Sequence, residues 1–85
     1  MDRSEIKDMI EKSLQAGTVP HGLNSLDDLK EAVSIAGEET NKAYGSGNSD
    51  MGDAWAKMVM MLKIHSINHL EQADKFNFIA DIMGR

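Results

Sequence analysis

Residues 50–83 carry a long seam of side chains at helical spacing, and this seam limits the folds open to an 85-residue chain. Successive positions lie alternately four and three residues apart, as in a coiled coil. The seam consists of Met51, Trp55, Met58, Leu62, His65, His69, Gln72, Phe76, Ile79 and Met83. We predict one helix over 50–83. Unbroken, it would be roughly 50 Å long, which is long for so small a chain, and we therefore expect a kink near Leu70 to Lys75.

A second apolar set on the same segment faces a different side of the helix; it consists of Met60, Ile64 and Ile67. A helix that is apolar on more than one side is usually buried on more than one side. Two shorter helices can cover one of these sides. The chain has no cysteine and therefore no disulfide to stabilise a small core. We expect it to self-associate, with another copy covering the remaining side.

Two shorter amphipathic helices precede this segment, over about residues 2–16 and 25–44. Asp2 with Glu5, and Ser25 with Asp28, have the spacing of a capping box at a helix start. Apolar residues at helical spacing follow each start. The loops over 17–24 and 45–49 contain glycines, and the first also contains Pro20, which a helix interior excludes.

The sequence therefore predicts one all-α domain over residues 1–85. In it, two short amphipathic helices pack on one long C-terminal helix, straight or kinked. Gly37 lies within the second helix, where glycine lowers helix stability by about 1 kcal/mol relative to alanine. We expect Gly37 either to admit a close neighbour or to mark a bend.

The charge of the chain limits the classes of partner that it can bind. The formal net charge is −5, which argues against nucleic acid, because phosphate binding needs a basic face. No apolar run approaches the roughly 20 residues of a membrane span. We therefore expect a cytoplasmic protein with no membrane partner. The stretch from Ala54 to Leu70 nevertheless contains no acidic residue.

Catalytic signatures are missing from the sequence. There is no cysteine for a nucleophile or a thiolate metal site. No nucleophile elbow or catalytic triad pattern occurs. The loop over 45–49 leads into a helix as phosphate-binding loops do, but it lacks the lysine of such loops, and Asp50 and Asp53 would repel phosphate. We predict a linker there, no enzymatic activity and no cofactor.

His65 and His69 lie four residues apart and share one helical face. Two imidazoles at this spacing can hold one metal ion, but they do not complete a tetrahedral site without further ligands. They are weak metal candidates, and we predict no metal site. A pH switch is a second interpretation, because two protonated rings would repel each other below an ordinary pKa near 6.5. The most economical interpretation is a pair of polar residues at an interface or in solvent.

Taken together, these patterns favour a small self-associating interaction protein: an adaptor, an inhibitor or a regulatory subunit. Chains of this size without cysteine are common among phage and bacterial accessory proteins. The methionine-rich third helix would bind the partner protein, since methionine is frequent on surfaces that accept varied partners and large aromatics anchor interfaces. The expected contact residues are Trp55, Met58, Met61, Leu62 and Phe76.

An alternative function is a small-ligand binder that holds an anion, such as a nucleotide, between copies. Lys57, Lys63 and His65 would attract the anion, and Tyr44 would stack on a base. The lysines do not share a face with the histidines, so this site requires neighbouring helices or copies. The simpler interpretation is that the lysines are solvated and that their stems cover apolar surface.

Overall fold

The structure is a computed structural model that describes residues 1–83, the last of them by its backbone alone. Gly84 and Arg85, and the seam side chain of Met83, lie outside this description. The described chain is all-α, as predicted, with no strand between residues 1 and 83. Its elements are α1 (Arg3–Ala16), α2 (Leu26–Gly45), α3 (Ser49–His69), α4 (Gln72–Phe78) and a π-helical turn η1 (Ile79–Met83).

The first two helices begin at the capping residues that the sequence indicates. The Asp2 carboxylate accepts a hydrogen bond from the backbone N–H of Glu5 at 2.9 Å. The Ser25 hydroxyl accepts one from the backbone N–H of Asp28 at 3.2 Å. Each bond satisfies a backbone donor that the first helical turn leaves free. At its other end α1 closes on Gly17, whose φ of 72° lies in the left-handed region that glycine adopts at low cost.

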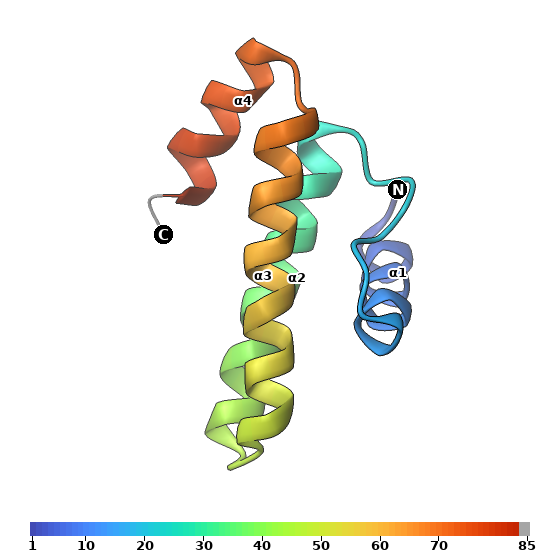
Figure 1. Cartoon of the computed structure of the whole chain (residues 1–85), viewed down its shortest axis with the longest axis vertical. Helices are drawn as coiled ribbons and strands as arrows, with labels where there is room; N and C mark the ends of the chain where they lie inside the picture. The colour runs from blue at the N-terminus through green and yellow to red at the C-terminus, as the bar shows by residue number, and fades with distance from the viewer. Residues whose placement is uncertain (84–85) are drawn as a thin grey trace.

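Helices α2 and α3 form a long antiparallel hairpin, which is the main body of the molecule (Figure 1). They are similar in length, with 20 and 21 residues. The turn between them is short, and Asn48 caps α3 by accepting a hydrogen bond from the Met51 N–H at 3.2 Å. The arrangement of two short helices on one long helix is therefore not confirmed.

The third predicted segment divides into two helices at Leu70. The ψ angle of Leu70 is 148°, which is extended backbone that no helix continues through. Leu70 is buried in the core, and α4 then folds back along α3 on the side away from the hairpin turn (Figure 1). The kink that we expected near Leu70 to Lys75 is confirmed as a break at Leu70, and it lets α4 and η1 bury their own apolar residues.

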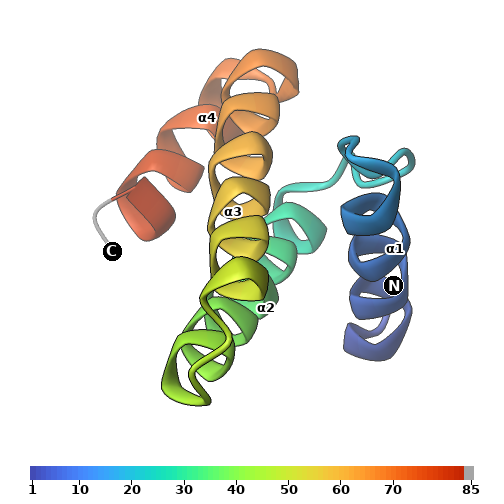
Figure 2. The same cartoon turned by 60° about the horizontal axis from the view of Figure 1, so that its bottom comes forward.

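Helix α1 and the α4–η1 segment pack on opposite sides of the hairpin (Figure 2). Arg3 of α1 forms ion pairs with both Glu31 and Glu38 of α2. On the other side, the Lys30 ammonium of α2 lies 2.6 Å from a carboxylate oxygen of Asp81. Ion pairs thus join both outer elements to α2, although exposed pairs of this kind contribute little stability.

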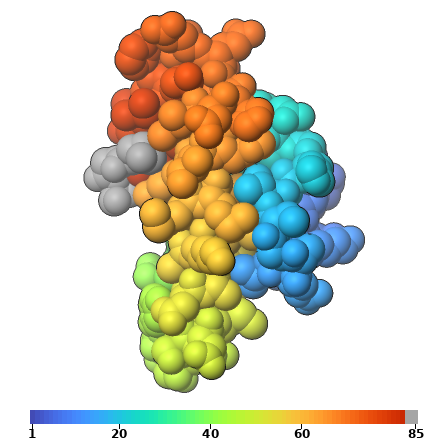
Figure 3. Space-filling view, viewed as in Figure 1, coloured from blue at the N-terminus to red at the C-terminus, as the bar shows by residue number. Residues whose placement is uncertain are grey.

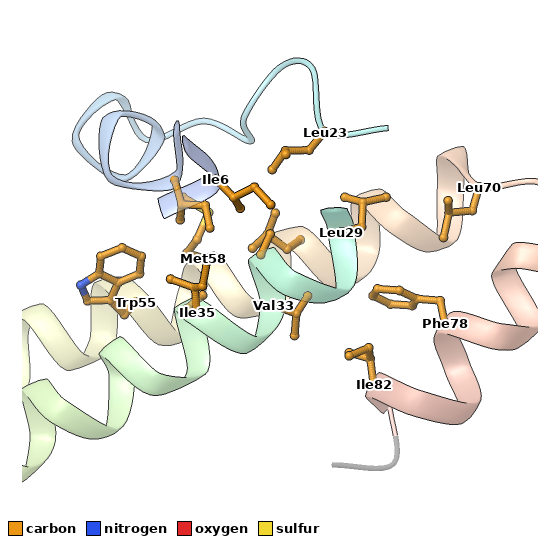
Figure 4. Packing of buried hydrophobic residues seen from close by; sticks show 14 residues of the cluster. Ile6, Leu23, Leu29, Val33, Ile35, Trp55, Met58, Leu70, Phe78 and Ile82 are labelled. Atoms are coloured by element: carbon orange, nitrogen blue, oxygen red, sulfur yellow. The ribbon is translucent and has the colours of Figure 1, made fainter. Parts of the chain in front are cut away.

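The core lies where the four helices meet. Phe78 and Ile82 reach from α4 and η1 toward α2 beside Leu29 and Val33 (Figure 4). The buried apolar cluster comprises Ile6, Ile10, Leu23, Leu29, Ala32, Val33, Ile35, Ala36, Trp55, Met58, Leu62, Leu70, Phe78 and Ile82. Removing these side chains from water is the main favourable contribution to folding.

Candidate functional site

The side of α3 that points away from the core carries exposed apolar side chains. Met60 is 63% exposed and Ile64 is 56% exposed, and both lie opposite the buried Leu62. We define the outer face of α3 as Lys57, Met60, Ile64 and Ile67. Helix α3 runs along the front of the space-filling view, where the other helices leave it open (Figure 3). The predicted second apolar set is therefore a surface of the single chain.

The lysines of α1 and α2 form ion pairs with carboxylates, whereas those of α3 do not pair with any carboxylate of residues 1–83. Lys7 and Lys42 both lie near Glu39, and Lys12 lies 3.0 Å from Asp8. Lys57 and Lys63 form no ion pair with any of residues 1–83. Since Ala54 to Leu70 also lacks acidic residues, the outer face of α3 combines exposed apolar side chains with uncompensated positive charge.

The contact residues expected from the sequence are placed differently. Trp55, Met58 and Leu62 are buried in the core of the chain, so they are not available to a partner while the chain is folded. Met61 is half-buried. Phe76 lies on α4 and is 64% exposed. Three of the five expected contact residues therefore lie in the core of the single chain, while Met61 and Phe76 keep exposed surface.

The residues of the alternative anion site do not come together within one chain. Tyr44 lies beside the hairpin turn, where its hydroxyl donates a 2.6 Å hydrogen bond to Asp53. That bond, together with burial and the charge of Asp53, raises the pKa of the Tyr44 phenol. Lys63 lines a groove between α2 and α3, whereas His65 lines a separate hollow of about 270 Å³ beside Val19.

His65 and His69 stack on each other, with ring centroids 4.2 Å apart and planes inclined by 23°. The Nδ1–H of His69 donates to the carbonyl oxygen of His65 at 2.9 Å, which fixes one ring to its own helix. Burial lowers the pKa of His65, and the nearby charges of His69 and His21 lower it further. Across residues 1–83, no cluster of three or more potential metal-ligating side chains occurs.

A groove of about 540 Å³ lies between α2 and α3, next to η1. We did not predict this groove from the sequence, because its position depends on where α4 and η1 end along the hairpin. Gly37 lies in its wall, and a Cβ built there would have no neighbour within 4 Å. The expectation that Gly37 admits a close neighbour is therefore wrong, since the glycine borders open space.

No family model, curated protein or solved structure matches the chain. None of the helices within residues 1–83 combines the length and the hydrophobicity needed to cross a bilayer. The fold and the surface of the chain are therefore the basis for any functional conclusion.

Proposed function

We propose that the chain is a non-enzymatic, self-associating interaction protein that binds another protein through the outer face of α3. It would act as an adaptor, an inhibitor or a regulatory subunit, in the cytoplasm. The observation that carries this proposal is the exposure of Met60 and Ile64 one helical turn apart on the side of α3 opposite the core.

The size of this surface suits a helix–helix contact. Residues four apart on a helix are neighbours on its surface, so Met60 and Ile64 form one apolar strip that Ile67 extends. Covering the exposed parts of Met60 and Ile64 would contribute about 2–3 kcal/mol. An amphipathic partner helix would bind such a strip through its own apolar residues, spaced three and four positions apart.

The charge beside the strip indicates the chemistry of the partner. Lys57 and Lys63 flank the apolar side chains and have no ion pair within residues 1–83. A partner helix with acidic residues beside its apolar face would compensate both ammonium groups. Such complementary charge speeds association and selects among partners.

Self-association through the same face depends on salt in the opposite way from binding of an acidic partner. Two copies of α3 in contact would cover each other's Met60 and Ile64, but they would also bring four lysines close together. Like charges oppose this pairing, and salt screens their repulsion. Self-association should therefore strengthen with salt, whereas binding of an acidic partner should weaken.

A designed peptide tests the heterologous contact. The probe is a fluorescent amphipathic helix with leucine on one face and glutamate beside it, and the readout is its anisotropy on titration with the full chain. We expect saturable binding that Met60→Asp weakens, because the substitution removes apolar contact and adds a charge that repels glutamate.

The matched control is Met51→Asp, which changes an exposed methionine near the start of the same helix. It should leave the affinity for the peptide unchanged. Equal weakening by both substitutions, or binding that neither affects, would contradict the assignment of the contact to the outer face of α3.

A further inference from the structure

The groove between α2 and α3 is the part of the hairpin surface that α4 and η1 leave open. Helix α4 lies beside the end of the hairpin opposite its turn, and η1 ends part of the way along (Figure 1). Beyond Ile82 the groove continues along both hairpin helices, with a volume of about 540 Å³. This volume lies within the range of about 300–1,000 Å³ that is typical of small-ligand sites.

Half of the ten residues that line the groove are apolar or glycine, and the other half are polar: Ser34, Glu38, Thr40, Asn41 and Lys63. Ala56 and Val59 of α3 supply partly exposed aliphatic surface, whereas Val33 of α2 and Ile82 of η1 are 6% and 1% exposed and contribute little. Gly37 adds space, because no atom lies within 4 Å of the point where its Cβ would be. A slender aliphatic chain can lie along this apolar part of the lining, where a polar sugar or base would leave hydrogen-bonding groups without partners.

The charged groups of the groove favour an anion. Lys63 lines it and forms no ion pair with residues 1–83. The acidic residue in the lining, Glu38, shares the Arg3 guanidinium of α1 with Glu31, so one positive charge is divided between two carboxylates. The Thr40 hydroxyl donates to the Ala36 carbonyl at 2.7 Å and is already engaged. Within the lining, the Lys63 ammonium is therefore the cation that an anionic ligand can pair with.

We propose that this groove binds a small amphipathic carboxylate, with its aliphatic chain along Gly37, Ala56 and Val59 and its carboxylate on Lys63. The ligand class follows from the combination of an apolar strip in the lining, Gly37, Ala56 and Val59, with a lysine that forms no ion pair within residues 1–83. The site lies within one chain, and it shares only Lys63 with the protein contact proposed for Met60 and Ile64.

The test uses decanoate, below the concentration at which it forms micelles, with the full chain followed by backbone amide NMR. We expect saturable shifts of the amides of Gly37 and Val59, with a dissociation constant below about 1 mM. Decanol has the same chain without the charge and should bind at least about tenfold more weakly, a difference of about 1.4 kcal/mol.

Two substitutions separate the apolar and charged parts of the site. Gly37→Leu should fill the groove and abolish decanoate binding, and the open space at Gly37 allows the chain to keep its helical circular dichroism. Lys63→Met should weaken decanoate binding about tenfold and leave decanol binding unchanged. The matched control, Lys57→Met, removes an exposed lysine outside the groove lining and should alter neither.

The proposal is wrong if wild-type chain shows no saturable shifts up to about 1 mM decanoate. Binding that persists in both Gly37→Leu and Lys63→Met would also overturn it, because the ligand would then lie elsewhere. Loss of binding in Lys57→Met to the same extent as in Lys63→Met would show a diffuse attraction to the basic face of α3 instead of a site.

Discussion

The ring of Tyr44 lies against the backbone of Gly52, so close that a Cβ at position 52 would come within 2.4 Å of two ring carbons. This contact joins the end of α2 to the start of α3 and is completed by the hydrogen bond from the Tyr44 hydroxyl to Asp53. The two helices approach each other at the hairpin turn because residue 52 has no side chain. The same contact explains why Tyr44, although 46% exposed, has a structural role.

Gly52→Ala should destabilise the fold. Crowding against the Tyr44 ring costs about 1–3 kcal/mol, and the higher helix propensity of alanine offsets only about 1 kcal/mol of this. We expect a net loss of about 1 kcal/mol in the free energy of unfolding, measured by urea denaturation. The matched control is Gly37→Ala, where the added Cβ meets nothing within 4 Å and should raise stability by up to about 1 kcal/mol. Changes of the same sign at both positions would contradict the contact.

Phe78 and Phe76 form a second matched pair, two residues apart on α4. Phe78 is fully buried, whereas Phe76 is 64% exposed. Phe78→Ala should lower the free energy of unfolding by about 3–5 kcal/mol, a large part of the roughly 4–13 kcal/mol available to a chain of this length. Phe76→Ala should change it by no more than about 0.5 kcal/mol. Equal effects in thermal or urea unfolding would mean that α4 does not dock as described.

The histidine pair predicts a decline in stability as the pH falls. Burial first, and then the charges of His69 and His21, lower the pKa of His65 below its ordinary value of 6.5. The unfolded chain therefore takes up the proton more readily than the folded chain does. The contribution of neutral His65 to stability is complete well above pH 6.5 and is lost as the pH falls through that value toward the lower pKa of the folded state.

Thermal unfolding at about pH 7.5 and about pH 5.5 measures this effect, since the two values bracket the ordinary histidine pKa. The wild-type melting temperature should be lower at the acidic pH. His65→Gln, which cannot titrate, should reduce the difference, whereas Lys57→Met should leave it unchanged. If the melting temperatures of His65→Gln at the two pH values differ as much as those of the wild type, groups other than His65 cause the pH dependence.

The sequence was informative where the interactions are local. Asp2 and Ser25 cap their helices through bonds to residues only three positions away, and such short-range patterns are visible in the sequence. The apolar set of Met60 and Ile64 also identified a second side of α3, which the structure leaves exposed.

The remaining features depend on residues far apart in the chain. The length of the third segment predicted a kink near Leu70, but no proline or glycine fixes its position. The break is stabilised by Phe78 and Ile82, which reach the core beside Leu29 and Val33. Contacts between distant parts of the chain also explain why we expected Trp55 and Met58 on a contact surface, whereas the structure buries them in the core. Their helical spacing marks an apolar side of α3 but does not say which element covers it.

Solution mass, measured by light scattering over a range of protein concentration and salt, tests self-association through α3 most directly. We expect a mass above the 9.4 kDa of one chain, rising with salt. Met60→Asp should return it to 9.4 kDa, and Met51→Asp should not. A wild-type mass of 9.4 kDa under all conditions, or an oligomer that Met60→Asp leaves intact, would contradict it.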